Sequence, residues 1–296
     1  MPRLLILGSL LMIAQVSSPQ CGSSSTSSTS SGAVANTVAI SVNGGPNNDS
    51  FNSPFTSVTI CVPGTSNCQT IGGIVIDTGS EGLRILSSAV TLQLPQQTAG
   101  SSSIVECLPF LDGFTWGPVQ TADVKLAGEV ASGIPIQLIG QDKFPTIPSG
   151  CASQGPSEET LADLDANGIL GVGPYAEDCG GGCTFTGASN PGLYYVCPTP
   201  STCQVTPLAV ANQVQNPVAH FGSDNNGVVI QLPAVAIGGA PAINGVLTFG
   251  IGTQSNNALG SATVLTTDAN GNFTTTFRSS SATGFIDTGS NGLYFL

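Results

Sequence analysis

Positive charge is nearly absent from this 296-residue sequence. Five Lys and Arg residues stand against 17 Asp and Glu residues, which gives a net charge of −12, and charged residues make up only 7% of the chain. A protein that binds nucleic acid neutralises phosphates with clustered Lys and Arg. The composition therefore excludes nucleic acid as an expected partner. It fits an ordinary acidic exported protein, and it fits equally a protein that works in acid.

Histidine is also scarce, since His220 is the only one, and no Gly-x-Ser-x-Gly motif is present. A Ser-His-Asp hydrolase would have to use His220, which lies in an expected loop, so that class is not favoured. The stretch that begins at Asp163 opens like a calcium loop, but Pro174 takes the twelfth position, where a bidentate Glu is required. We expect no metal ion and no cofactor.

The N-terminal apolar run is too short for a membrane span of about 20 residues. It follows Arg3, covers residues 4–16 and is succeeded by small or polar residues, which predicts a signal peptide over residues 1–20. Residues 21–36 begin with Cys21 and are rich in Ser, Thr and Gly, so we expect a flexible tether. The sequence therefore predicts that the protein is exported and that it is located in the periplasm, at the cell surface or outside the cell.

The position of Cys21 leaves two alternatives open. A Cys between an apolar run and a Ser-rich tract resembles a bacterial lipoprotein acylation site, which would tether the protein to a membrane. Residues 18–20 read Ser-Pro-Gln and depart from the usual Leu-small-small pattern of such sites. Lipidation at Cys21 and secretion without a lipid are both compatible with the sequence.

Nine cysteines in an exported chain predict disulfides, and setting Cys21 aside leaves eight. Cys61 and Cys68 flank a turn-rich stretch between two strand-forming runs, so we expect a disulfide across a hairpin. Cys107 is paired with Cys151 on weaker grounds. The last four are paired among themselves, namely Cys179, Cys183, Cys197 and Cys203. The spacing of Cys179 and Cys183 could suit thiolate ligands of a metal ion, but no histidine lies near them in the sequence.

The abundance of Gly (38) and Pro (20), with many Ser, Thr, Val and Ile, predicts an all-β fold with many turns. The length allows two lobes, which we place at residues 37–205 and 206–296. Expected strands include residues 37–42, 57–62, 70–76, 167–173, 227–231, 235–238 and 246–250. Residues 157–164 are the best helical candidate. Residues 263–267 and 273–277 flank a turn signal at 268–272 and predict a hairpin.

One short string, Ile-Asp-Thr-Gly-Ser, occurs twice, at residues 76–80 and 286–290, which lie 210 positions apart. Each copy follows apolar residues and precedes a Gly-Leu pair. Burying a carboxylate at the end of an apolar strand is costly, so two copies spaced one lobe apart suggest that Asp77 and Asp287 meet and share a proton. The alternative is that both strings are Asx-type turns, because Asp, Thr, Gly and Ser all favour turns.

With these strings, the chain resembles the pepsin-like aspartic peptidases over residues 37–296. Residues 167–171 look like that family's Asp-Gly-Ile-Leu-Gly strand, which crosses behind the first catalytic loop. Trp116 and Gly117, on an expected hairpin, stand where the family has the Tyr-Gly of its flap. In its details, including a Cys-rich insert, the sequence looks closer to an uncharacterised family of bacterial exported proteins with this core.

The resemblance implies an all-β, bilobal barrel and an exported endopeptidase that acts on peptides or proteins. Asp77 and Asp287 would hold one water, which attacks the peptide carbonyl. Thr78 and Thr288 would hydrogen-bond across the lobes beneath the pair. The resemblance also implies that two glycines let the backbone approach and donate to the carboxylates, and that two serines bond to their outer oxygens; these are Gly79 with Gly289 and Ser80 with Ser290.

The sequence departs from the family pattern at the flap and at its end. Arg84 stands where the family often has Trp, and it could stack on Trp116 as a cation–π pair. Otherwise the flap has lost its catalytic task, and the alternative function is a non-catalytic surface lipoprotein that binds through the cleft. The chain also ends six residues after Ser290. We therefore expect a fragment with an incomplete second lobe and a poorly fixed loop around Asp287.

Overall fold

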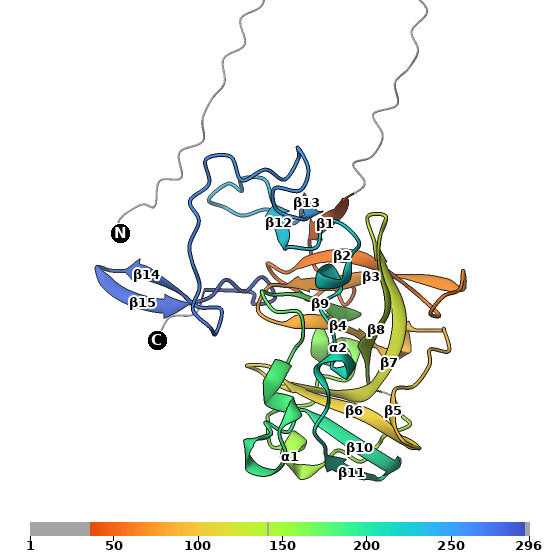
Figure 1. Cartoon of the computed structure of the whole chain (residues 1–296). Helices are drawn as coiled ribbons and strands as arrows, with labels where there is room; N and C mark the ends of the chain where they lie inside the picture. Colours follow the sequence, from red (N-terminus) through yellow and green to blue (C-terminus); the bar gives the residue numbers. More distant parts are fainter. Residues whose placement is uncertain (1–35, 141, 294–296) are drawn as a thin grey trace, which may run out of the picture. The chain divides into compact units, whose positions relative to one another are not determined.

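Strands dominate the computed structural model of the chain, which describes residues 36–140 and 142–293 (Figure 1). The all-β prediction is confirmed. The predicted signal peptide, Cys21 and the tether up to residue 35 lie outside the described residues, so these stay predictions. Within the described ranges, every helix is too short or too polar to cross a membrane.

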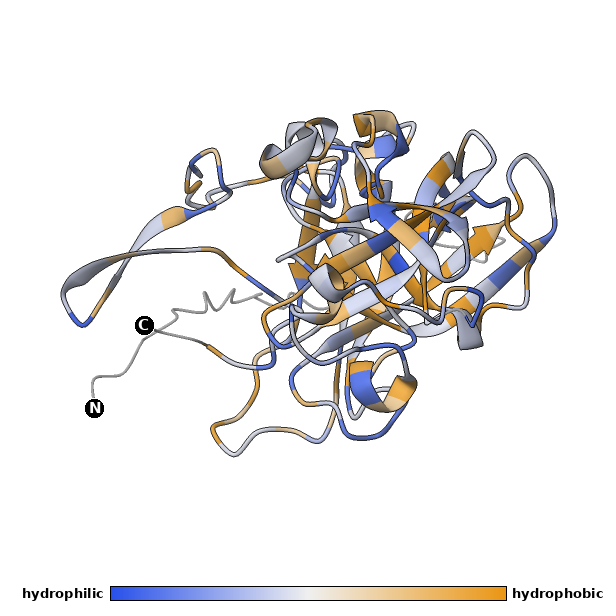
Figure 2. Ribbon diagram, turned by 90° about the horizontal axis from the view of Figure 1, so that it is seen from below, coloured by the Kyte–Doolittle hydropathy of each residue, from blue (hydrophilic) through white to orange (hydrophobic). Residues whose placement is uncertain are grey.

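Six strands close into a barrel, because the ladder that runs from β7 through β8, β4, β9, β3 and β2 returns to β7. Aliphatic side chains fill its interior, among them Ile60, Ile74 and Ile136. Figure 2 shows hydrophobic residues along these central strands. The six strands are β2 (Pro54–Cys61), β3 (Cys68–Asp77), β4 (Glu81–Leu86), β7 (Phe114–Leu126), β8 (Glu129–Ile139) and β9 (Gly168–Val172).

The sheet extends from the barrel on two sides. Beyond β7 lie β6 (Ser102–Pro109), β5 (Thr98–Ala99), β10 (Tyr194–Thr199) and β11 (Thr202–Val205). Beyond β2 lie β1 (Thr37–Val42), β13 (Ile243–Phe249) and β12 (Val228–Gln231). The pairing of β1 with β13 joins segments of the two predicted lobes, and the described residues belong to one compact unit. The boundary at residue 205 stays a prediction.

The helices are short and connect strands. The α-helices are α1 (Ser149–Ala152) and α2 (Leu161–Leu164), and the 3-10 helices are η1 (Ser87–Ala89), η2 (Gly180–Thr184), η3 (Gly187–Ser189), η4 (Val210–Asn212) and η5 (Pro217–His220). The helix predicted over residues 157–164 is thus reduced to its second half. Ser157 instead bridges to Phe114, and the side chain of Thr160 caps α2 by accepting from the Asp163 N–H. Because an N-cap residue has non-helical backbone angles, the helix begins only at the next residue, Leu161.

The hairpin predicted from residues 263–267 and 273–277 is wrong. β14 (Phe273–Phe277) pairs with β15 (Ser280–Gly284) instead, and residues 263–267 form no strand. The turn itself forms, since the Asp268 carboxylate accepts from the N–H groups of Asn270 (2.8 Å) and Asn272 (3.0 Å). Such a side-chain turn reverses the chain without requiring its flanks to pair. Residues 235–238 likewise form no strand.

The eight cysteines of the described region form four disulfides. The predicted pair, Cys61 and Cys68, lies directly opposite in the β2–β3 ladder with its Cα atoms 3.9 Å apart. The others are Cys107–Cys151, Cys179–Cys183 and Cys197–Cys203, so no thiolate is left for metal among them. Four disulfides fit an exported protein.

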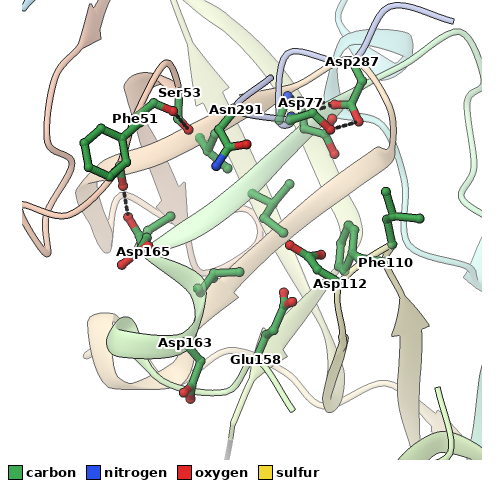
Figure 3. Close-up of a pocket in the computed structure, with 18 of the residues that line it drawn as sticks. Phe51, Ser53, Asp77, Phe110, Asp112, Glu158, Asp163, Asp165, Asp287 and Asn291 are labelled. Atoms are coloured by element: carbon green, nitrogen blue, oxygen red, sulfur yellow. Dashed lines mark hydrogen bonds between the residues drawn. The ribbon is translucent and has the colours of Figure 1, made fainter. Parts of the chain in front are cut away.

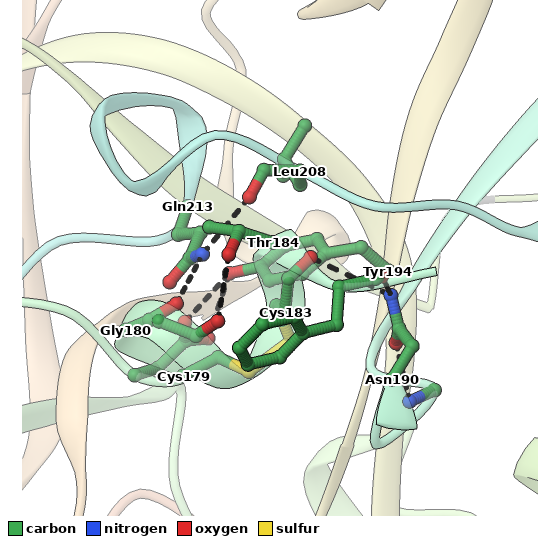
Figure 4. The surroundings of a disulfide bond; sticks show 12 residues. Cys179, Gly180, Cys183, Thr184, Asn190, Tyr194, Leu208 and Gln213 are labelled. Carbon is green, nitrogen blue, oxygen red and sulfur yellow. Dashed lines mark hydrogen bonds between the residues drawn. A yellow bond between two sulfur atoms is a disulfide. The ribbon is translucent and has the colours of Figure 1, made fainter. Parts of the chain in front are cut away.

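The Cys-rich insert, residues 179–203, is held by hydrogen bonds to backbone carbonyl groups around the Cys179–Cys183 disulfide (Figure 4). The Gln213 side chain donates to the carbonyl oxygens of Gly180 (2.8 Å) and Leu208 (3.1 Å). Cys183 packs in a buried cluster with Tyr194 and Leu208. This packing holds the preceding residue, Asp178, against the barrel, where it meets a buried arginine.

Candidate active site

The first Asp-Thr-Gly-Ser string follows the barrel core. Asp77 is the last residue of β3 and pairs in parallel with Gly171 of β9, while β9 pairs on its other side with β4. The strand at 168–172 therefore lies between the two strands that flank the loop, as the resemblance implies. Burial of Ile76 and Leu83 fixes both ends of the loop, and the Asp77 residue is only 6% exposed.

The second string has a different local environment. β15 ends at Gly284, and the two apolar residues before Asp287, Phe285 and Ile286, are 60% and 65% exposed. The expectation that a buried apolar strand delivers Asp287 is therefore wrong. Among the described strands, β15 pairs with β14 alone, and this two-stranded sheet does not bury these side chains.

Two threonines bind the second loop to the first through four reciprocal hydrogen bonds. The Thr78 hydroxyl donates to the carbonyl oxygen of Ile286 (2.7 Å) and accepts from the Thr288 N–H (3.1 Å). The Thr288 hydroxyl donates to the carbonyl oxygen of Ile76 (2.7 Å) and accepts from the Thr78 N–H (3.2 Å). The loop around Asp287 is thus held in place across 210 positions of sequence, where the sequence predicted a poorly fixed loop.

Each carboxylate is oriented by its own string. Asp77 accepts from the Gly79 N–H at 2.7 Å and from the Ser80 hydroxyl. Asp287 accepts from the N–H groups of Gly289 (2.9 Å) and Ser290 (3.0 Å), and from the Ser290 hydroxyl at 2.6 Å. Hydrogen bonds of this kind fix the direction in which the carboxylate oxygens point.

The two carboxylates lie close together at one end of the cavity (Figure 3), and a glycine of each loop lies against the carboxylate of the other. A Cβ atom on Gly79 would lie 2.8 Å from the carboxylate carbon of Asp287, and one on Gly289 would lie 2.8 Å from that of Asp77. Real Cβ atoms do not approach so closely, so only glycine permits this contact at either position. The site therefore consists of two like-charged groups in close contact.

The protonation of Asp77 reflects this arrangement. Burial raises the pKa of Asp77 to about 6; the hydrogen bonds from Ser80 and Gly79 oppose the rise, and the neighbouring Asp287 carboxyl group adds to it. Two carboxylates in contact cannot both ionise readily, so the pair keeps one proton to a higher pH than a lone Asp does.

Removing the Thr78 hydroxyl is expected to loosen the second loop. In Thr78→Val, the carbonyl of Ile286 and the N–H of Thr288 lose their partner, at a cost of about 1–2 kcal/mol. Amide hydrogen exchange at Thr288 should speed up by roughly tenfold or more. Thr78→Ser keeps the hydroxyl and is the matched control, with nearly unchanged exchange. Unchanged exchange in Thr78→Val would show that these bonds do not hold the loop.

A cavity of about 620 Å³ opens beside the two carboxylates, and both of them line it. Its walls include the β1–β2 loop, the segment from Glu158 to Ala166, and the turn between β6 and β7. From that turn, Phe110 and Asp112 line the cavity (Figure 3), and Leu111 between them also lines it. Within residues 36–140 and 142–293, no group of three or more His, Cys, Asp or Glu side chains is arranged to hold a metal ion.

Trp116 and Gly117 do not take the flap position that the sequence predicted for them. Trp116 is 1% exposed, packs edge-on against Tyr195, and donates from its indole nitrogen to the carbonyl oxygen of Phe144 at 2.9 Å. A Cβ atom on Gly117 would lie 1.9 Å from the carbonyl oxygen of Leu138, so Gly117 serves the close approach of two strands. Neither residue lines the cavity.

The predicted hairpin is present as β6 and β7, but its turn is formed by residues that the sequence analysis did not identify. The Phe110 N–H donates to the carbonyl oxygen of Gly113 at 2.7 Å, so the turn precedes Trp116 by three residues. Asp112 and Gly113 form an Asp-Gly pair between two strand-forming runs, which is a strong short-range hairpin signal. That signal could have located the turn before the structure was known.

The sequence suggested that Arg84 could stack on Trp116, but the structure shows a different environment for Arg84. It is fully buried, and one terminal nitrogen lies 2.8 Å from both a Glu106 carboxylate oxygen and an Asp178 carboxylate oxygen. Its other terminal nitrogen donates to the carbonyl oxygen of Glu81 at 2.6 Å, one residue after the first string. The guanidinium thus joins the first loop, the β6–β7 hairpin and the Cys-rich insert.

The family model described as "Protein of unknown function (DUF3443)" matches residues 32–296. No curated protein matches the chain. Among solved structures, the chain is similar to an aspartic proteinase from Irpex lacteus, with 17% sequence identity and a TM-score of 0.46. The match covers 86% of this chain and 63% of that one, so the chain spans less than two thirds of that proteinase's length.

Proposed function

The chain belongs to the family described as protein of unknown function (DUF3443), and from its site we propose that it is an exported aspartic-type endopeptidase. Asp77 and Asp287 would activate the water that hydrolyses the peptide bond. The observation that carries the proposal is the reciprocal contact of the two strings, in which each threonine bonds to the other loop and each glycine lies against the other carboxylate. Two independent Asx turns would not require this exchange.

The proposed reaction uses one proton shared by the pair. We assign the proton to Asp77, which is buried and whose burial raises its pKa, and the role of base to the more exposed Asp287. Asp287 takes a proton from the water as the water oxygen attacks the carbonyl carbon, and Asp77 gives its proton to the carbonyl oxygen. When the intermediate collapses, the C–N bond breaks, one proton goes to the leaving nitrogen and the other returns to the pair. The products are a free carboxyl group and a free amine.

Cleavage of a diverse peptide library by the full-length protein tests this function. Products should appear at acidic pH, and a statine-type transition-state analogue, which mimics the tetrahedral intermediate, should block their formation. The alternative is a surface lipoprotein that binds peptides through the same cavity. It predicts that peptides and the analogue bind while no product forms, so binding and cleavage are measured on the same samples.

The pH dependence of cleavage follows from Asp77. A raised pKa means that the proton stays on Asp77 until the pH passes about 6, so the singly protonated pair persists up to that pH. The ratio kcat/KM, which reports the pKa values of the free enzyme, should therefore fall as the pH rises through about 6, by roughly tenfold for each further pH unit. Rates measured with one peptide over a pH series check this. A rate that keeps rising above about pH 8 would contradict it.

A further inference from the structure

The cavity beside the two aspartates is far more acidic than the chain as a whole. Seven of the 20 residues that line it are Asp or Glu, and none is Lys, Arg or His. The whole chain has 17 Asp and Glu residues, so a large share of them gathers here and an acidic composition alone does not explain it. Besides Asp77 and Asp287, the acidic lining residues are Asp49, Asp112, Glu158, Asp163 and Asp165.

Two of these residues form a second carboxyl pair, held by the hairpin backbone. The Glu158 N–H donates to the carbonyl oxygen of Phe114, and the Phe114 N–H donates to that of Pro156, both at 2.9 Å. This ladder places Glu158 beside Asp112, and Figure 3 shows both side chains at the same wall of the cavity. Burial raises the pKa of Glu158 to about 7, and the Asp112 carboxylate adds to the rise. A cationic side chain placed beside the pair would favour the ionised form of these carboxyl groups and bind to it.

Large apolar side chains at the cavity are exposed to solvent. Phe51, from the β1–β2 loop, is 69% exposed, and Leu111, beside Asp112 in the hairpin turn, is 89% exposed. The side chains of Lys and Arg combine an aliphatic stem with a charged end. An apolar residue next to a carboxyl pair suits such a side chain, whereas no arrangement for a metal ion is present among the described residues.

We propose that the cavity selects peptides with a lysine or arginine near the bond that is cleaved, and that Asp112 and Glu158 are the specificity-determining residues. This inference rests on the proposed peptidase function and names its substrate class. The acidic wall adds to what the two aspartates require, because it lies in the same cavity and presents carboxyl groups where an apolar wall would serve an apolar substrate. Hydrogen bonds to charged groups should give a preference of about tenfold to a hundredfold.

Matched peptides that differ at one position test the proposal. The position carries Lys, Arg, norleucine or Glu, and norleucine keeps the aliphatic stem without the charge. For the full-length protein, kcat/KM should be about tenfold to a hundredfold higher for Lys and Arg than for norleucine, and lowest for Glu. In Asp112→Asn/Glu158→Gln, the ratio of Lys to norleucine should fall to about one. Asp142→Asn, an exposed change outside the cavity lining, should keep the wild-type ratio.

Each outcome decides a different question. Equal cleavage of the Lys and norleucine peptides by the wild type, or an unchanged ratio in the double variant, overturns the substrate class and leaves the peptidase function standing. If no peptide is cleaved, the peptidase function fails. Binding of the same peptides to Asp77→Asn/Asp287→Asn then tests the inferred preference. If that preference is correct, the Lys peptide binds more tightly than the norleucine peptide. Equal binding would overturn it.

Discussion

Asp77→Asn is expected to lower peptide cleavage by about a thousandfold or more, because it removes the group that gives its proton to the carbonyl oxygen. The fold should persist. An asparagine can still accept from the Gly79 N–H and can meet the Ser80 hydroxyl, and it avoids an ionised carboxylate at a site where burial disfavours one. Thermal unfolding and kcat/KM, measured on the same preparation, separate the two effects.

Asp287→Asn should have a similar effect on cleavage, because Asp287 is the proposed base. Asp142→Asn is the matched control, since it makes the same change at an exposed site outside the cavity and should leave the rate within about twofold. If either active-site variant retained more than a small fraction of the wild-type rate at unchanged stability, the two aspartates would not form the catalytic pair.

Arg84→Met is expected to lower the free energy of unfolding by about 3–5 kcal/mol. Removing the guanidinium leaves the carboxylates of Glu106 and Asp178 buried without their cation, and a buried charge without its partner is strongly destabilising. The Glu81 carbonyl also loses its donor. Denaturant unfolding with the disulfides intact measures the change.

The control for this change is Arg278→Met, which makes the same substitution in the exposed β14–β15 turn and should cost less than about 1 kcal/mol. Adding Asp178→Asn to Arg84→Met should restore part of the lost stability, because it removes one uncompensated charge. Burial, with Glu106 beside it, already raises the pKa of Asp178 well above its usual value. A loss of stability no larger than that of Arg278→Met would contradict the buried ion-pair role.

Elements that depend on residues close in sequence were predicted well. The strand at residues 37–42 and the Cys61–Cys68 hairpin follow from short-range alternation and from turn residues between two runs. The predicted helix failed where Thr160 caps it later than its pattern indicated. The predicted hairpin around residues 268–272 failed because an Asx turn reverses the chain without pairing its flanks. Local residue preferences determine that a turn forms, but they do not determine which strands on either side of it pair.

The sequence by itself determined the all-β class, the disulfide chemistry and the candidate pair, because the repeated string marks Asp77 and Asp287 wherever they lie. Only the tertiary structure decided how they meet. The threonine contacts join residues 210 positions apart, and Arg84 finds its partners 22 and 94 positions away. The register of β6 against β7 buries Trp116 and turns Asp112 toward the cavity. Such contacts depend on strand register and on packing through space, and the residues nearest in sequence do not encode either.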